Sequence, residues 1–260
     1  MEFTGKKVLI VGTGKSGVAA AELLQKKQAD LIIFDGNKEL KEEQVKEKSG
    51  AFSDAEIVLG ELPESVMEEL DLVVLSPGVP TDLPMVNAIR DKKIPIIGEI
   101  ELAYQCAKGK ILAITGTNGK TTTTALLGEI MKNYFSDVKV VGNIGIPYTS
   151  VAADTTEETV TVAEISSFQL ETAVEFRPEV SAILNITPDH LNRHHTMENY
   201  IAAKESITKN QTADDICVLN YEDEVLREFG AGLQTKVIYF SSARKLENGY
   251  YLDGTDICRA

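Results

Sequence analysis

The stretch GTNGKTT, at residues 116–122, has the residue types and spacing that bind nucleotide phosphates. It follows the apolar run ILAIT, so the pattern is a strand, a glycine-rich turn and a helix start. In such a turn, backbone N–H groups surround the phosphates, Lys120 reaches the β- and γ-phosphate oxygens, and the Thr121 hydroxyl can ligate Mg²⁺. The spacing between the glycines is shorter than in the generic GxxxxGK[ST] pattern, and a threonine-rich helix start without a ligand is the alternative. We predict an ATP or GTP site formed by Gly116, Thr117, Asn118, Gly119, Lys120, Thr121 and Thr122.

A second glycine-rich turn, GTGKSG at residues 12–17, follows the apolar run KVLIV and opens a helical pattern. Glycines at this spacing allow a tight turn and a close approach of a phosphate to the backbone. Asp35 ends the next strand, where such folds bind a ribose hydroxyl, and Ser76 and Gly78 follow a further strand at the same sheet edge. Three interpretations remain open: an NAD site, a UDP-sugar site in the same crevice, or a tight turn with no ligand.

Three further residues are candidates for chemistry beside the second loop. Glu164 lies near the end of the apolar run VTVAEI, where a carboxylate can hold Mg²⁺ or simply face water. His190, in NITPDH, also follows a strand and can bind a metal or a substrate, whereas the neighbouring His194 and His195 are interpreted as solvated loop residues. Lys204 lies on the apolar face of a helix predicted over residues 197–210, so it is either a site residue or a lysine that extends to solvent.

Apolar runs alternate with helical patterns along the whole chain, which predicts parallel sheets covered by helices on both faces. The predicted strands fall into two sets, separated between residues 97 and 110, and the sequence ends in a hairpin with Asp253 and Gly254 at the turn. We therefore predict an α/β protein with a Rossmann-like domain at residues 1–97 and a P-loop NTPase-like α/β domain at residues 98–260.

Composition narrows the possible partners. The chain has 260 residues and a formal net charge of −14, so it lacks the basic surface that binds nucleic acid or anionic membranes. Its three cysteines have no disulfide or zinc-site spacing, and no apolar run is long enough for a signal peptide or a membrane span. We expect a cytoplasmic monomer.

Taken together, GTNGKTT, AEISSFQLE, NITPDHLNRH and YIAAKESI resemble the Mur ligases, the ATP-dependent amide-bond ligases of peptidoglycan synthesis. The motifs GTGKSG, SPGVP, IGEIEL and GNIGIP are similar to those of the branch that adds D-glutamate to UDP-N-acetylmuramoyl-L-alanine. The resemblance implies these two compounds as substrates, an acyl-phosphate intermediate, and ATP with two Mg²⁺ ions as cofactors.

The resemblance also implies a role for each candidate residue. The UDP-sugar site would comprise Lys15, Ser16, Asp35, Ser76, Gly78 and Asn143. One Mg²⁺ would be held by Thr121 and Glu164, and the second by His190 and Lys204, with Lys204 carboxylated on its amine. Catalysis would then involve Lys120, His190 and Lys204.

The resemblance implies a third, C-terminal domain that the present sequence does not include, and a central domain at residues 98–260 that is incomplete at its C-terminal end. We therefore expect a fragment that binds nucleotides but is not fully active. A non-catalytic nucleotide-binding module is one alternative. A nicotinamide-dependent oxidoreductase is another, but it leaves GTNGKTT unexplained.

Overall fold

The structure, a computed structural model, describes residues 2–260, which form two compact units. The first unit runs to Lys108 and includes two later segments, Ile146–Thr155 and Glu171–Glu175. The second unit comprises Gly109–Gly145, Thr156–Leu170 and Phe176–Ala260. The division therefore falls inside the interval between residues 97 and 110, while the exact domain boundary at residue 97 stays a prediction.

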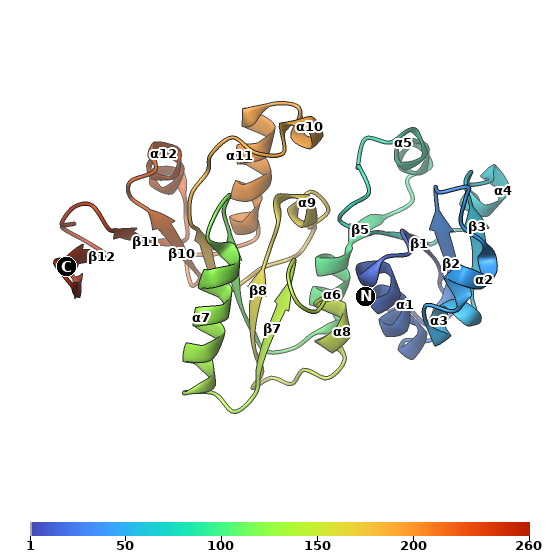
Figure 1. Cartoon of the computed structure of the whole chain (residues 1–260), viewed down its shortest axis with the longest axis horizontal. Helices are drawn as coiled ribbons and strands as arrows, with labels where there is room; N and C mark the ends of the chain where they lie inside the picture. Colours follow the sequence, from blue (N-terminus) through green and yellow to red (C-terminus); the bar gives the residue numbers. More distant parts are fainter. Residues whose placement is uncertain (1) are drawn as a thin grey trace. The chain divides into compact units, whose positions relative to one another are not determined.

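The first unit contains a five-stranded parallel sheet in the order β3-β2-β1-β4-β5 (Figure 1). Its strands are β1 (Lys7–Val11), β2 (Asp30–Asp35), β3 (Glu56–Leu59), β4 (Leu72–Leu75) and β5 (Ile96–Gly98). The helices are α1 (Lys15–Lys26), α2 (Glu42–Lys46), α3 (Gly50–Ser53), α4 (Glu64–Met67), α5 (Pro84–Asp91), α6 (Glu99–Cys106) and α8 (Thr149–Ala152). Strand β1 lies at the centre, and its carboxyl end leads directly into the first glycine loop.

The second unit contains an eight-stranded sheet in the order β13-β12-β11-β10-β9-β6-β8-β7, with only β13 antiparallel to its neighbour. The strands are β6 (Lys110–Thr115), β7 (Val138–Gly142), β8 (Val160–Glu164), β9 (Val180–Ile183), β10 (Ile216–Asn220), β11 (Lys236–Ser241), β12 (Tyr250–Asp253) and β13 (Asp256–Arg259). The helices are α7 (Lys120–Lys132), α9 (Ser167–Leu170), α10 (Leu191–His194), α11 (Met197–Glu205), the 3₁₀ helix η1 (Ser206–Thr208) and α12 (Glu224–Gly232).

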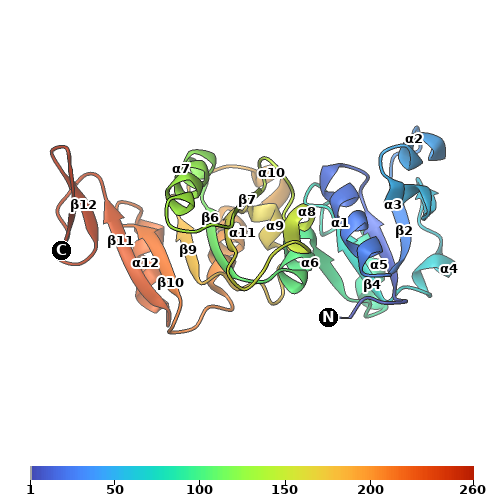
Figure 2. The same ribbon diagram turned by 90° about the horizontal axis from the view of Figure 1, so that it is seen from below.

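Helix α7 packs on β6, β7 and β8, and Leu127 and Met131 cover the buried side chains of Ile114, Val160 and Val162. This packing fixes the amino end of α7 at the end of β6. Figures 1 and 2 both show the short helices α9 and α10 beside α11, so the loops after β8 and β9 gather around one end of α11.

Two segments of the first unit are attached to α6 through buried carboxylates. Glu99 accepts hydrogen bonds from the backbone N–H and the hydroxyl of Thr149, both at 2.7 Å. Glu101 accepts from the backbone N–H groups of Val174, at 2.9 Å, and Glu175, at 3.0 Å. No sequence pattern indicated that these later residues belong to the first unit.

The structure confirms the α/β class and corrects several element ends. Strand β9 stops at Ile183, and the residues after it contact the phosphate loop. Helix α11 stops at Glu205 and continues as η1 only to Thr208. The final hairpin has Gly254 and Thr255 in its loop, because Asp253 is still paired with Asp256. Within residues 2–260, no helix has both the length and the apolar character needed to cross a bilayer.

Candidate functional site

The first glycine loop connects β1 to α1, and its last glycine is required by close packing. A Cβ atom on Gly17 would lie 1.9 Å from the carbonyl oxygen of Gly12. At Gly14, by contrast, a Cβ atom would meet nothing within 4 Å. Lys15 and Ser16 form the first turn of α1, and no side chain caps this helix start. No side chain therefore satisfies the N–H groups of the first turn, which leaves them for an anion.

Asp35 is part of the framework of this loop. Its Oδ2 accepts hydrogen bonds from the Thr13 backbone N–H, at 3.2 Å, and from the Thr13 hydroxyl, at 2.7 Å. Its Oδ1 accepts from the backbone N–H of Asn37 at 3.0 Å. Both carboxylate oxygens are thus already engaged, which weakens the NAD interpretation because that interpretation assigns Asp35 to ribose hydroxyls.

Ser76 provides a polar atom that suits a ligand. Its hydroxyl is buried, and within the described part of the chain it has no hydrogen-bond partner. The Ser76 hydroxyl lies beside the loop, since a Cβ atom on Gly12 would be 2.8 Å from the Ser76 oxygen. A buried hydroxyl without a partner is unfavourable by roughly 1–3 kcal/mol, so a bound polar group would stabilise this arrangement. Gly78, which follows, is exposed.

The phosphate loop between β6 and α7 is held by the segment after β9. The N–H groups of Thr117 and Asn118 donate to the backbone and side-chain oxygens of Asn185, both at 2.9 Å. Gly119 has a φ of 85°, a left-handed conformation that glycine adopts without strain, and it begins α7. The amide groups that remain for phosphate are those of the first turn of α7, where Lys120, Thr121 and Thr122 lie.

Two lysines converge on one carbonyl group of this loop. The ammonium of Lys120 donates to the oxygens of Gly116, at 2.9 Å, and Thr117, at 3.0 Å. The ammonium of Lys204 donates to the same Gly116 oxygen at 2.8 Å. Lys204 is only 2% exposed, so it does not extend to solvent. Burial and the neighbouring Lys120 ammonium lower the pKa of Lys204 to about 7.

Tyr200 supports Lys204 on α11. The Lys204 nitrogen lies 4.6 Å from the centre of the Tyr200 ring, and the Tyr200 hydroxyl is 3.0 Å from the Thr117 hydroxyl. Helix α11 is therefore joined to the phosphate loop at two points. The sequence pattern placed Tyr200 on an apolar face but gave no signal for its hydrogen bond.

Glu164 ends β8 and is almost fully buried. It pairs with Ile114 of β6 on one side and with Gly142 of β7 on the other, so it lies next to the strand that leads into the phosphate loop. The side-chain amide of Asn143 donates to Glu164 at 3.0 Å. Asn143 belongs to the second unit, and its grouping with Lys15, Ser16, Asp35, Ser76 and Gly78 of the first unit stays a prediction.

The histidines differ from one another in their surroundings. His190 is exposed, has a φ of 51°, and contacts Asp189 and the ring of Phe168. His195 is also exposed. The interpretation of His194 as a solvated residue was wrong: its ring is buried, lies 5.2 Å from the Tyr200 ring, and has Nε2 2.9 Å from the Ser167 hydroxyl. Packing among the helices α9, α10 and α11 determines this burial, and the local sequence carries no sign of it.

Of the predicted metal ligands, some offer the oxygen atoms that Mg²⁺ prefers and others do not. Within residues 2–260, no group of three His, Cys, Asp or Glu side chains is placed to hold a metal. A buried carboxylate on Glu164 and the hydroxyl of Thr121 are oxygen donors of the kind Mg²⁺ prefers, and Mg²⁺ usually retains several waters. Lys204 as an amine offers no oxygen, so a second ion at Lys204 and His190 requires a carboxylated lysine.

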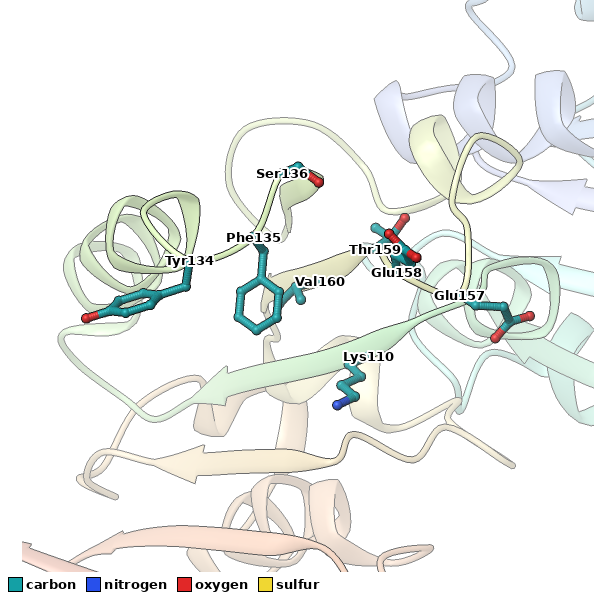
Figure 3. Close-up of a pocket in the computed structure, with 8 residues that line it drawn as sticks. All are labelled: Lys110, Tyr134, Phe135, Ser136, Glu157, Glu158, Thr159 and Val160. Carbon is teal, nitrogen blue, oxygen red and sulfur yellow. The ribbon is translucent and has the colours of Figure 1, made fainter.

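A pocket of about 360 Å³ lies elsewhere in the second unit, at the amino ends of β6 and β8 (Figure 3). Lys110 and Val160, the first residues of those strands, line it together with Tyr134 and Phe135, which follow α7. The phosphate loop follows the carboxyl end of β6, so this pocket is at the opposite sheet edge and is separate from the predicted site.

A family model described as "Mur ligase middle domain" matches residues 114–256, which include the phosphate loop, Glu164, His190 and Lys204. The chain belongs to the Mur ligase family. A second model, "Mur ligase MurD-like, N-terminal domain", matches residues 6–98 of this Mur ligase chain and includes the first glycine loop. The resemblance stated from the motifs is thereby confirmed.

Curated relatives of this Mur ligase chain carry the name UDP-N-acetylmuramoylalanine--D-glutamate ligase. The protein from Lachnoclostridium phytofermentans is 58% identical over 252 residues, which are 97% of this chain and 56% of the relative. The protein from Clostridioides difficile is 49% identical over 258 residues, or 99% of this chain and 57% of the relative. The chain thus spans little more than half the length of these curated relatives.

Solved structures show the same fold. The UDP-N-acetylmuramate:L-alanyl-gamma-D-glutamyl-meso-diaminopimelate ligase from Neisseria meningitides superimposes with a TM-score of 0.61 at 16% identity, over 95% of this chain and 83% of that one. The UDP-N-acetylmuramate-alanine ligase from Thermotoga maritima gives a TM-score of 0.53 at 23% identity, over 95% and 54% of the two chains.

We predict that Gly17→Ala destabilises the ligand-free protein by more than about 2 kcal/mol, because the new methyl group overlaps the Gly12 carbonyl. Gly14→Ala is the matched control, since its methyl group enters open space, and a loss of about 1 kcal/mol or less is expected. Urea unfolding of both variants measures the difference, and equal losses would show that the Gly17 contact is not limiting.

We also predict that Lys204 makes stability depend on pH. Its folded-state pKa, about 7, lies below the ordinary value of 10.5, so the unfolded chain binds more protons between these values and stability rises with pH there. The unfolding free energy of the wild type relative to Lys204→Met should increase from about pH 7 to about pH 9, by at most about 1.4 kcal/mol per pH unit. The exposed Lys209 supplies the control variant Lys209→Met, for which no such slope is expected. If the unfolding free energy of the wild type relative to Lys204→Met did not change with pH, the buried amine would have an ordinary pKa.

Proposed function

We propose that the protein to which this chain belongs is an ATP-dependent ligase that adds D-glutamate to UDP-N-acetylmuramoyl-L-alanine. The observation that carries the proposal is the pair of lysines at the start of α7, where Lys120 and Lys204 share the Gly116 carbonyl. Two amines that close together cannot both keep a proton at little cost: burial and the Lys120 charge favour the neutral form of Lys204, which leaves the Lys120 ammonium for the phosphates of a nucleotide triphosphate. The names of the curated relatives support D-glutamate and the UDP-sugar as substrates.

The first unit would hold the UDP end of the substrate. The uncapped first turn of α1 suits a diphosphate, and the buried Ser76 hydroxyl suits a polar group of the nucleotide. Lys15, Ser16, Asp35, Ser76, Gly78 and Asn143 are the residues that we assign to this ligand, with Asp35 acting through Thr13 as part of the loop. Binding energy far from the reacting carboxylate would then orient it.

The second unit would carry the phosphoryl transfer. The L-alanyl carboxylate attacks the γ-phosphorus of ATP, ADP leaves, and the D-glutamate amine displaces phosphate from the acyl phosphate to form the amide. Lys120 and the N–H groups of the first α7 turn stabilise the negative charge that develops on the phosphoryl oxygens. The loop of Gly116, Thr117, Asn118, Gly119, Lys120, Thr121 and Thr122 positions the phosphates, with Thr117 and Asn118 supported by Asn185.

Magnesium would be held by Thr121 and Glu164, and a second ion by His190 and Lys204. Bound Mg²⁺ supplies additional positive charge at the phosphates. Lys204 serves this role only after CO₂ has added to its neutral amine, which turns a buried cation into a carboxylate that can bind metal. The buried position of Lys204 and its low pKa favour the neutral amine that this reaction needs.

We also propose that the protein is a cytoplasmic monomer, as we expected from the sequence. The free cysteines Cys106, Cys217 and Cys258 are consistent with a reducing compartment. Whether this chain alone forms the amide is a separate question, and we expect little turnover without the remaining length found in the relatives.

Calorimetric titration tests the two binding sites. The chain should bind UDP-N-acetylmuramoyl-L-alanine and, in the presence of Mg²⁺, ATP. Lys120→Ala should abolish ATP binding and leave the UDP-sugar affinity unchanged, because the phosphate loop and the first glycine loop belong to different units.

The control for this experiment is Lys132→Ala, at the other end of α7, where the lysine pairs with Glu129. This variant should bind both ligands like the wild type. Loss of the UDP-sugar in Lys120→Ala would disprove the two-site division. Binding of NAD⁺ in place of the UDP-sugar would restore the oxidoreductase alternative.

Carboxylation of Lys204 can be observed directly. In ¹³C-bicarbonate, the protein should show a carbamate carbon resonance that is absent from Lys204→Arg and retained in Lys209→Met. The chemical reason is that only a neutral amine adds CO₂, and burial favours the neutral amine at Lys204, whereas Lys209 is exposed. A spectrum without the resonance at any pH between about 7 and 9 would eliminate this role.

A further inference from the structure

Lys48 is a residue of the first unit that the sequence patterns did not select. It lies between α2 and α3, and its ammonium donates to two oxygens of Thr13, the carbonyl at 2.9 Å and the hydroxyl at 2.8 Å. Thr13 is the second residue of the first glycine loop. A lysine 35 positions away in the sequence therefore places its charge on the loop itself.

The position of Lys48 is fixed by the residue that follows it. The Ser49 hydroxyl caps α3 by accepting from the Ala51 N–H, at 3.1 Å, and donates to Glu22 of α1 at 3.1 Å. The segment is thus joined both to α3 and to the helix that starts at the glycine loop. This attachment keeps the Lys48 ammonium at the loop before any ligand binds, which lowers the entropic cost of using it in binding.

Neighbouring lysines are engaged by carboxylates, whereas Lys48 is not. Lys46 pairs with Glu42 at 2.6 Å, and Lys38 pairs with Glu61 at 2.7 Å. In the part of the chain that the structure describes, the Lys48 ammonium donates hydrogen bonds to the two neutral oxygens of Thr13. Its positive charge is therefore still available to an anion, and charge-assisted hydrogen bonds are stronger than bonds between neutral groups.

The same threonine hydroxyl connects Lys48 to Asp35. The Thr13 hydroxyl donates to Asp35 at 2.7 Å and accepts from Lys48 at 2.8 Å. Asp35 therefore places a negative charge at a loop that, under the proposed function, must receive a diphosphate, in a chain whose net charge is already −14. Lys48 offsets that charge at close range, where protein and solvent screen it least.

We infer that Lys48 is a specificity-determining residue of the first glycine loop, which it makes selective for a nucleoside diphosphate over an uncharged nucleoside. This inference rests on the proposed function, because it assumes that the loop binds the UDP end of the substrate. It adds a residue from the α2–α3 connection to a site otherwise built from strand ends and from α1.

Titrations with UDP and with uridine test the inference through the difference between the two ligands. Lys48→Met should weaken UDP binding about tenfold or more and change uridine binding less than about twofold, because only UDP carries the charge that Lys48 contacts. Lys48→Arg, which keeps the charge, should remain within about threefold of the wild type for UDP. Added salt should weaken UDP binding more steeply in the wild type than in Lys48→Met.

Lys46→Met is the matched control, since it removes a lysine of the same segment that is already paired with Glu42. It should bind UDP like the wild type. Equal weakening of UDP and uridine in Lys48→Met, together with a lower melting temperature, would mean that Lys48 only stabilises the loop, and the inference would be wrong. Unchanged UDP affinity in Lys48→Met would overturn the inference alone, whereas a wild type that binds neither UDP nor the UDP-sugar would overturn the proposed function as well.

Discussion

The phosphate loop is organised around a single carbonyl group, that of Gly116, which accepts hydrogen bonds from two lysine amines. Lys120 reaches it from the first turn of α7, and Lys204 reaches it from α11, 88 residues later in the sequence. Two cations at one acceptor repel each other, and the protein interior does not screen them as water does. Burial first, and then the Lys120 ammonium, give Lys204 its low pKa in the ligand-free protein. For the function we propose, the consequence is a phosphate loop that carries the Lys120 ammonium beside a neutral amine.

The surrounding structure holds that arrangement in place. Tyr200 lies against Lys204 and hydrogen-bonds to Thr117, and Asn185 binds the backbone of the phosphate loop. The buried His194 packs on Tyr200 and contacts Ser167, so the loop after β8 is included as well. These segments add to the packing of α7 on β6, β7 and β8 in fixing the start of that helix.

The first glycine loop differs from the phosphate loop in the charges that lie at it. Here too a lysine binds loop oxygens, but Lys48 is exposed and is balanced by Asp35 through the Thr13 hydroxyl. The second loop thus brings together two lysine amines, one of them buried and with a low pKa, and the first loop has a nearly neutral pair. Under the proposed function, this difference suits a triphosphate that reacts at the second loop and a diphosphate that is only held at the first.

The sequence by itself determined the two α/β units, most strand positions, both glycine loops and the place of Lys204 on the apolar face of its helix, whereas its burial at the phosphate loop came from the tertiary structure. These features depend on local periodicity and on turn chemistry, which neighbouring residues specify. Tertiary structure alone decided the burial of His194, the use of Asp35 within its loop, the contact of Lys48 with Thr13, and the inclusion of Ile146–Thr155 and Glu171–Glu175 in the first unit. Each of these requires a hydrogen bond or a packing contact between segments far apart in the chain, and no pattern of adjacent residue types specifies which distant partner a side chain meets.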